Sequence, residues 1–134
     1  MLHVRDLPLE SCLAVRTTTS LARVAELAEQ AGARYVLVRD ATGDVKGVQL
    51  TTVAHWMAKQ APSQTAEEIP VVEGVLVEPG TSLMEALTML AHSPASVLLV
   101  REAQEGTTRI VQRNLVEMTA GTDAAGARRT DFLS

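Results

Sequence analysis

The chain has 134 residues, 46% hydrophobic and 21% charged, which is the composition of a folded domain and excludes a fully disordered chain. A net charge of −4 and a single Trp, Tyr and Phe argue against a nucleic-acid-binding protein, which needs a basic face and commonly stacking rings. There is no apolar run near the roughly 20 residues of a membrane span, no apolar secretory signal, and Cys12 is alone, so we expect a cytoplasmic protein.

The first part of the chain predicts a helix followed by two strands. Apolar residues recur at helical spacing over 21–31, after a Thr/Ser run that offers N-cap oxygens and before Gly32, a typical helix stop. The nearly continuous apolar run over 34–39 predicts a buried strand. The turn residues 40–44 then predict a hairpin that leads into a returning strand over 45–50.

A second helix is predicted over 51–60, with Thr51 or Thr52 as its cap, and Pro62 ends it. The polar, turn-rich residues 62–69 that follow are predicted to be a linker.

The same order returns after the linker. The stretch "VVEGVLVEP" predicts a strand, and Ser82 and Glu85 have the spacing of a capping box at the start of the helix "LMEALTMLA". The stretches "SVLLVR", "EAQEGT", "TRIVQ" and "RNLVEM" predict a strand, a turn, a strand and a helix. We expect residues 120–134 to form a flexible tail, in which Phe132-Leu133 either docks on a partner or belongs to an unstructured end.

Identical stretches confirm that the sequence is repeated. Thr19-Ser20-Leu21 returns as Thr81-Ser82-Leu83, and Leu37-Val38-Arg39 returns as Leu99-Val100-Arg101, both at an offset of 62 residues. One half alone would be marginally stable. We therefore expect an α/β (α+β) fold of two β-α-β-β-α repeats packed about a pseudo-twofold axis, with clefts for small molecules between them. The expected boundaries are 1–61 for the first repeat, 62–69 for the linker, 70–119 for the second repeat and 120–134 for the tail.

This pattern resembles a known family. The phrase "PGTSLMEAL", the stretch "VLVRDATGDVKGVQLTTVAHWM" and "VRDL" at Val4 to Leu7 resemble the tandem cystathionine-β-synthase (CBS) domain pair, or Bateman module, over roughly residues 4–120. The resemblance implies binding of a regulatory ligand such as AMP, ADP, ATP or S-adenosylmethionine, and regulation of a partner protein. It also implies dimers formed through the helices.

The family's nucleotide signature follows the last strand of each repeat. It reads glycine, two apolar residues, Thr or Ser, two variable residues and Asp, and the resemblance implies that the hydroxyl contacts phosphate and the Asp holds the ribose hydroxyls. In the first repeat Gly47 is present, but Leu50 stands at the hydroxyl position and Val53 at the Asp position.

The second repeat departs from the signature further. The offset of 62 puts Arg109 at the glycine, Gln112 at the hydroxyl position and Leu115 at the Asp position. A register slipped by one residue puts Val111 and Asn114 at the last two positions. Neither register restores the carboxylate, so we expect ribose recognition, if it occurs, to use other groups.

What remains near the last helices is a set of hydroxyl, amide and guanidinium groups, which can hold an anion at a helix N-terminus. The candidate ligand-binding residues are Gly47, Thr51, Thr52, Arg109, Gln112, Arg113 and Asn114. The competing interpretations are solvated arginines at 109 and 113 and helix caps at 51 and 52.

Trp56 either stacks on an adenine or, as we favour, belongs to the core or to a dimer interface. The candidate dimer contacts are Trp56, Met57 and Met118. The three histidines lack metal-ligand spacing, and no catalytic motif is present, so we expect neither a metal nor an enzyme.

Two functions follow. The first is a stand-alone regulatory module that senses an adenine nucleotide or related small molecule and signals to a partner protein. The alternative is a CBS-like interaction module, a homodimer whose pockets no longer bind a ligand.

Overall fold

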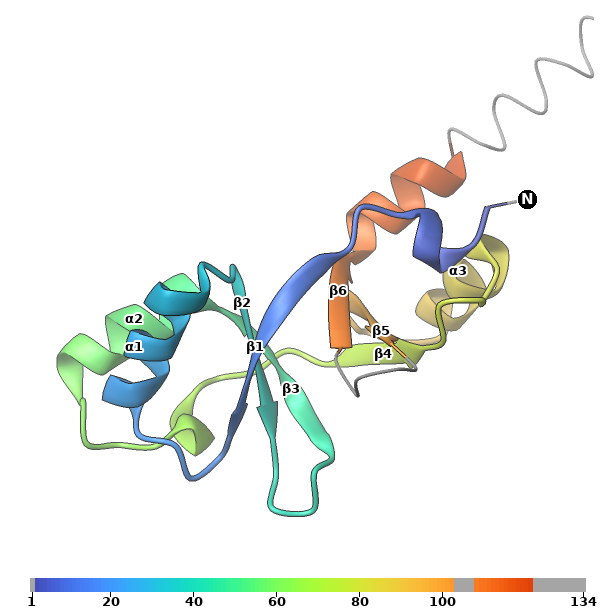
Figure 1. Ribbon diagram of the computed structural model, residues 1–134. Coiled ribbons are helices and arrows are strands. Elements are labelled where there is room, and N and C mark those ends of the chain that lie inside the picture. Colours follow the sequence, from blue (N-terminus) through green and yellow to red (C-terminus); the bar gives the residue numbers. More distant parts are fainter. Residues whose placement is uncertain (1, 103–107, 122–134) are drawn as a thin grey trace, which may run out of the picture. The chain divides into compact units, whose positions relative to one another are not determined.

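The computed structural model describes residues 2–102 and 108–121, which form two compact units (Figure 1). The first unit consists of residues 10–74, and the second unit combines residues 2–9 with the chain from residue 75 onward. The predicted turn at 103–107 and most of the predicted tail, 122–134, lie outside the described residues.

The first unit is a three-stranded sheet with two helices on one face (Figure 1). Its strands lie in the order β3-β2-β1, with β1 parallel to β2 and β2 antiparallel to β3. The elements are β1 (Glu10–Arg16), α1 (Leu21–Ala31), β2 (Tyr35–Arg39), β3 (Val45–Leu50), α2 (Thr51–Gln60) and the 3-10 turn η2 (Ala66–Glu68).

Local chemistry explains where α1 begins and ends. The Ser20 hydroxyl accepts the N–H of Arg23 at 3.2 Å, and Gly32 closes the helix with a φ of 63°, a left-handed conformation that favours glycine. Both predicted signals are therefore confirmed. The buried stripe of α1 packs with alternate residues of β2, Val36 and Val38, in the core of this unit.

The second unit repeats this plan. Its strands lie in the order β6-β5-β4, with β5 antiparallel to β6. The elements are the 3-10 turn η1 (Val4–Asp6), β4 (Gly74–Val77), α3 (Leu83–Ala91), β5 (Val97–Arg101), β6 (Thr108–Gln112) and a last helix over residues 113–121, drawn in red in Figure 1. Ser82 is the N-cap of α3 and accepts the N–H of Glu85 at 3.1 Å, as predicted. The predicted β-α-β-β-α order is thus confirmed in both halves.

The units are not simply the two halves of the sequence, because the segment before each first strand packs elsewhere. The N–H of Leu83 donates to the carbonyl of Leu2 at 3.0 Å, and the N–H of Leu21 donates to the carbonyl of Gln64 at 2.7 Å. Both members of the second pair are 62 positions from their counterparts in the first, with the segments exchanged between units. Residues 2–9 therefore complete the second repeat's unit, as the segment from residue 64 onward completes the first's.

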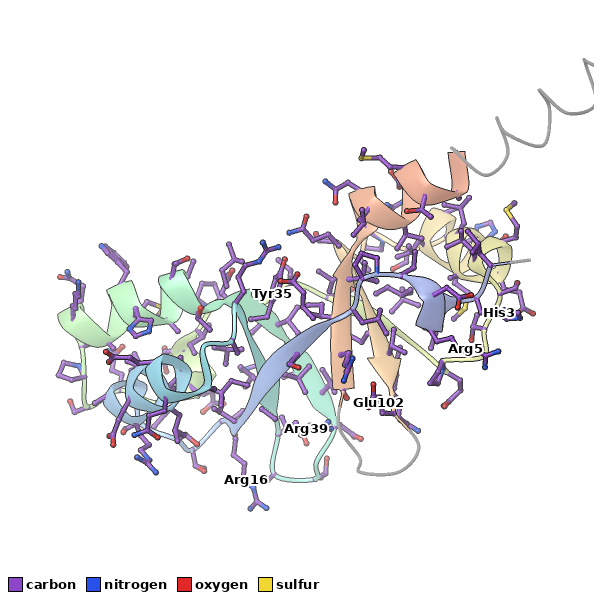
Figure 2. The ribbon with its side chains drawn as sticks, turned by 45° about the horizontal axis from the view of Figure 1, so that its top comes forward. His3, Arg5, Arg16, Tyr35, Arg39 and Glu102 are labelled. Atoms are coloured by element: carbon purple, nitrogen blue, oxygen red, sulfur yellow. The ribbon has the colours of Figure 1, made fainter. Side chains whose placement is uncertain are left out.

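The exchanged segments are part of each core. Val4 in η1 and Ala66 in η2 are equivalent positions, and both are fully buried in the unit on which they pack. His3 and Arg5, labelled in Figure 2, flank Val4 on this segment. Residues 62–69, for which the sequence predicts a linker, carry η2 and pack within the first unit.

Candidate functional site

The first candidate site is the junction of β3 and α2 in the first unit. Gly47 on β3 lies opposite Val38. A Cβ atom at Gly47 would lie 2.7 Å from the Cβ of Val71 and 2.8 Å from the carbonyl oxygen of Val72. Val72 forms an antiparallel bridge with Val48, with N–H···O distances of 3.1 and 2.9 Å. The glycine is therefore required by the close passage of the chain at 71–72, whether or not it also contacts a ligand.

The prediction that Thr51 or Thr52 caps α2 is wrong. The N-cap is Leu50, which makes no side-chain cap bond, and the helix begins at Thr51. The reason is that Thr51 is held by the carbonyl of Arg34, which accepts its backbone N–H at 2.8 Å and its hydroxyl at 3.2 Å. Thr51 is 7% exposed, whereas Thr52 is exposed. The N–H of Leu50 donates to the side chain of Gln49 at 2.9 Å.

Arg34 lies beside this junction and is already engaged. Its guanidinium lies 3.2 Å from a carboxylate oxygen of Glu10 and 5.2 Å from the centre of the Tyr35 ring. A hydrogen bond to the Tyr35 hydroxyl, also 3.2 Å long, is the main cause that raises the pKa of Arg34. Tyr35 begins β2 and Arg39 ends it (Figure 2).

The second candidate site is the junction of β6 and the last helix in the second unit. Arg109 lies opposite Val100, just as Gly47 lies opposite Val38 at positions 62 residues earlier. The unslipped register is therefore the structural one, and the slipped alternative is excluded. The Arg109 guanidinium is paired with Glu102 at 2.8 Å, and both side chains are partly exposed. Arg109 is therefore neither at a glycine-like close approach nor without a counter-charge.

Arg113 holds its own unit together. Its guanidinium donates to the carbonyls of Ser93 at 2.8 Å and Ala95 at 3.1 Å, and to the carboxylate of Glu117 at 2.7 Å. Its backbone N–H donates to Ser96 at 2.9 Å, the equivalent of the bond from Thr51 to Arg34. The interpretation of Arg113 as a solvated arginine is wrong, because three protein acceptors surround its guanidinium.

The remaining candidates differ in exposure. Gln112 is partly buried, while Asn114 is exposed at the position equivalent to Thr52. Thr52 and Asn114 thus present an open hydroxyl and an open amide in the first turn of the last helix of each repeat, where the helix dipole favours an anion.

The candidate dimer residues separate into two kinds. Trp56 and Met118 are equivalent positions and are 64% and 66% exposed, which excludes a core role for Trp56. Met57 is partly buried and packs against the core of the first unit.

A groove beside α3 was not predicted. It has a volume of about 480 Å³ and is lined by Thr81, Ser82, Met84, Glu85, Thr88 and Met89. Met84 and Met89 are 59% and 42% exposed. The available signal was that both methionines fall outside the buried stripe of α3, which consists of Leu83, Ala86 and Leu90.

The other reactive groups make no site. Burial, with a smaller contribution from Glu10, raises the pKa of the Cys12 thiol from 9.0 to about 11, which makes it a poor nucleophile. Within residues 2–102 and 108–121, no three His, Cys, Asp or Glu side chains gather as metal ligands. None of the helices in these ranges has the length and apolar character needed to cross a membrane.

Comparison with known proteins establishes the fold. No protein-family model matches the sequence, and no curated protein matches it significantly. Among solved structures, the CBS domains of a transcriptional regulator from Streptococcus pneumoniae match with a TM-score of 0.56 and 17% identity, over 88% of this chain and 98% of that one.

The CBS-pair protein CBSX2 from Arabidopsis thaliana matches with a TM-score of 0.57 and 17% identity, over 92% of this chain and 97% of that one. A structure of CBSX2 in complex with AMP gives a TM-score of 0.55 at 17% identity, over 92% and 99%. The chain therefore has the fold of a CBS-domain pair, as its sequence pattern predicts.

Proposed function

We propose that this chain is a regulatory CBS-pair module that binds an adenine nucleotide or a related small molecule and signals to a partner protein. The observation that carries the proposal is the shared fold with CBSX2, which has been crystallised in complex with AMP, over 92% of this chain. The role is regulatory rather than catalytic, because the described residues offer no activated nucleophile and no acid–base pair that the fold brings together.

The side chains limit how such a ligand is held. Thr51, Arg109 and Arg113 have their polar groups bonded within the protein, so they are not free donors. Thr52 and Asn114 are open and supply a hydroxyl and an amide at two helix starts. Without a carboxylate for two ribose hydroxyls, we expect weaker binding than the family's signature supports, since charge-assisted hydrogen bonds are the stronger ones.

The mechanism we propose is a population shift. A ligand that prefers one conformation of the module raises the population of that conformation, and the partner protein recognises it. The ligand's effect is limited to the difference between its affinities for the two conformations.

The test is to identify small molecules released when the purified protein is denatured, by mass spectrometry, and to add the identified compound back in a thermal unfolding assay. We expect an adenine-containing compound whose addition raises Tm as its concentration exceeds Kd. Thr52→Ala and Asn114→Ala should each weaken this effect by about 1 kcal/mol, or roughly fivefold in Kd. Gln60→Ala, at the far end of α2, is the control and should leave it unchanged.

The exposure of Trp56 and Met118 favours a second function, association with another protein, including a second copy of this chain. Large apolar side chains that are exposed at equivalent positions of both repeats are typical of interface anchors. Light scattering on the wild type, Trp56→Ala and Met118→Ala tests this function, with Lys59→Ala as the control. A strictly monomeric wild type would remove the support for self-association.

A further inference from the structure

The first unit shows how the chain leaves a last helix. α2 ends at Gln60, and the following residues turn back across the start of α1. The N–H of Ala22 donates to the carbonyl of Pro62 at 3.1 Å, and the N–H of Leu21 donates to that of Gln64 at 2.7 Å. The chain that follows the last helix therefore supplies acceptors for the first turn of α1, whose N–H groups have no partner within the helix.

The second unit has half of this arrangement in its described residues. The N–H of Leu83 donates to the carbonyl of Leu2 at 3.0 Å, which replaces the bond from Leu21 to Gln64. Met84 is the equivalent of Ala22, and its N–H finds no backbone acceptor within residues 2–102 and 108–121. The position equivalent to Pro62 is Ala124, three residues past 121. The missing acceptor is thus expected from the segment that follows the last helix.

The groove beside α3 begins at this same place, since Met84 lines it together with Glu85 and Met89. Its surface is particular to the second unit. At the position equivalent to Glu85 the first unit has Arg23, which is paired with Glu26 at 2.9 Å, whereas Glu85 makes no ion pair among the described residues. The groove therefore combines two exposed thioether side chains with an unpaired carboxylate.

We propose that residues 122–134 turn back across the N-terminal end of α3 and occupy this groove. The segment contains Arg128-Arg129, which match the charge of Glu85, and Phe132-Leu133, which match the two methionines. Favourable contacts between sulfur and aromatic rings make methionine a suitable neighbour for Phe132.

The length of the segment is sufficient. Ten residues from Ala124 onward span up to about 33 Å when extended, whereas the nine residues of α3 extend about 14 Å. Both residue pairs therefore reach the groove with slack. The docked segment covers the methionine face of α3 and must leave before a partner protein can use that face.

The test follows the ε-methyl signals of 13C-labelled methionine in the full chain and in a chain that ends at Gly121. We expect the Met84 and Met89 signals to shift on truncation and their sulfur atoms to be oxidised several-fold faster by peroxide, because oxidation follows exposure. The Met57 signal, from the first unit, is the reference that stays in place. The double variant Phe132→Ser, Leu133→Ser should reproduce the shift in a full-length chain, while Thr130→Ala should not.

Two results would overturn the proposal. The first is that the Met84 and Met89 signals are the same in the full chain, the truncated chain and the double variant. The second is a shift that grows with protein concentration, because it would place the segment of one copy on α3 of another. If truncation prevents folding, the double variant decides alone. The readout uses no added ligand, so it is independent of the proposed nucleotide binding.

Discussion

The junctions before α2 and before the last helix share a backbone and differ in their side chains. In both units the N–H of the first helical residue, Thr51 or Arg113, donates to a carbonyl just before the middle strand, at 2.8 and 2.9 Å. The side chain of Thr51 adds one bond to the same carbonyl, whereas Arg113 reaches three acceptors. The repeated fold thus depends on the backbone bond, and the side chains at the same positions have become different structural parts.

The largest expected effect tests whether the two cores are equivalent. Leu21 and Leu83 occupy the same position in α1 and α3 and are 0% and 3% exposed. Leu21→Ala and Leu83→Ala should each lower the free energy of unfolding by about 3 kcal/mol, since both remove a buried side chain and leave a cavity. Urea unfolding measures the loss, and hydrogen exchange should locate it in the altered unit. A loss below about 1 kcal/mol at either position would contradict equal cores.

The next effect sharpens the contrast between Gly47 and Arg109. Gly47→Ala places a Cβ against the chain at 71–72 and should cost about 1–3 kcal/mol, as overpacking does. Arg109→Ala removes only a partly exposed ion pair and should cost less than about 1 kcal/mol. Urea midpoints of the two variants decide this comparison. Equal tolerance of both changes would mean that the chain at 71–72 does not pass against Gly47.

A similar effect is expected at the helix starts. Arg113→Met leaves the carbonyls of Ser93 and Ala95 without their charged donor and should cost about 2 kcal/mol. Thr51→Val removes one hydroxyl bond and should cost about 1 kcal/mol. Glu117→Gln is the control, because it weakens only an exposed pair. If Arg113→Met costs no more than Glu117→Gln, the two carbonyl contacts do not stabilise the unit.

The smallest expected effect concerns a group present in one unit only, since the equivalent of Cys12 is Gly74. The pKa of the Cys12 thiol is raised from 9.0 to about 11 by burial and, less, by Glu10. The unfolded thiol therefore ionises first, and the stability that this group contributes is fully present below pH 9 and lost as pH rises through about 11.

The thiol's partial exposure reduces the contribution to about 1 kcal/mol. Cys12→Ala should therefore flatten the decline in unfolding free energy between neutral and strongly alkaline pH. An unchanged alkaline slope in this variant would show that the thiol does not titrate with a raised pKa.

The element order and several boundaries were predictable because their signals are local. Ser20 and Ser82 precede apolar helices, Gly32 supplies the left-handed residue, and hairpin residues separate the strands. The cap of α2 was not predictable in the same way. The carbonyl of Arg34 that holds Thr51 comes from 17 residues earlier, so a local rule for Thr caps does not see it.

Long-range contacts also hid the exchanged segments and the role of Arg113. Pro8 and Pro70 stand 62 residues apart and mark the exchanged segments in the sequence, but the short turns η1 and η2 have no helical periodicity. The acceptors of Arg113 lie up to 20 residues away. The candidate site was therefore predictable as a location, at the start of each last helix, and not as a set of free polar groups.

The most direct test of the central claim is calorimetry of the purified full chain with AMP, ATP and S-adenosylmethionine in turn. The account predicts saturable heat with at least one of the three, reduced in Thr52→Ala or Asn114→Ala and unchanged in Gln60→Ala. No heat from any of them at millimolar ligand would contradict ligand sensing and leave association through Trp56 and Met118 as the function to pursue.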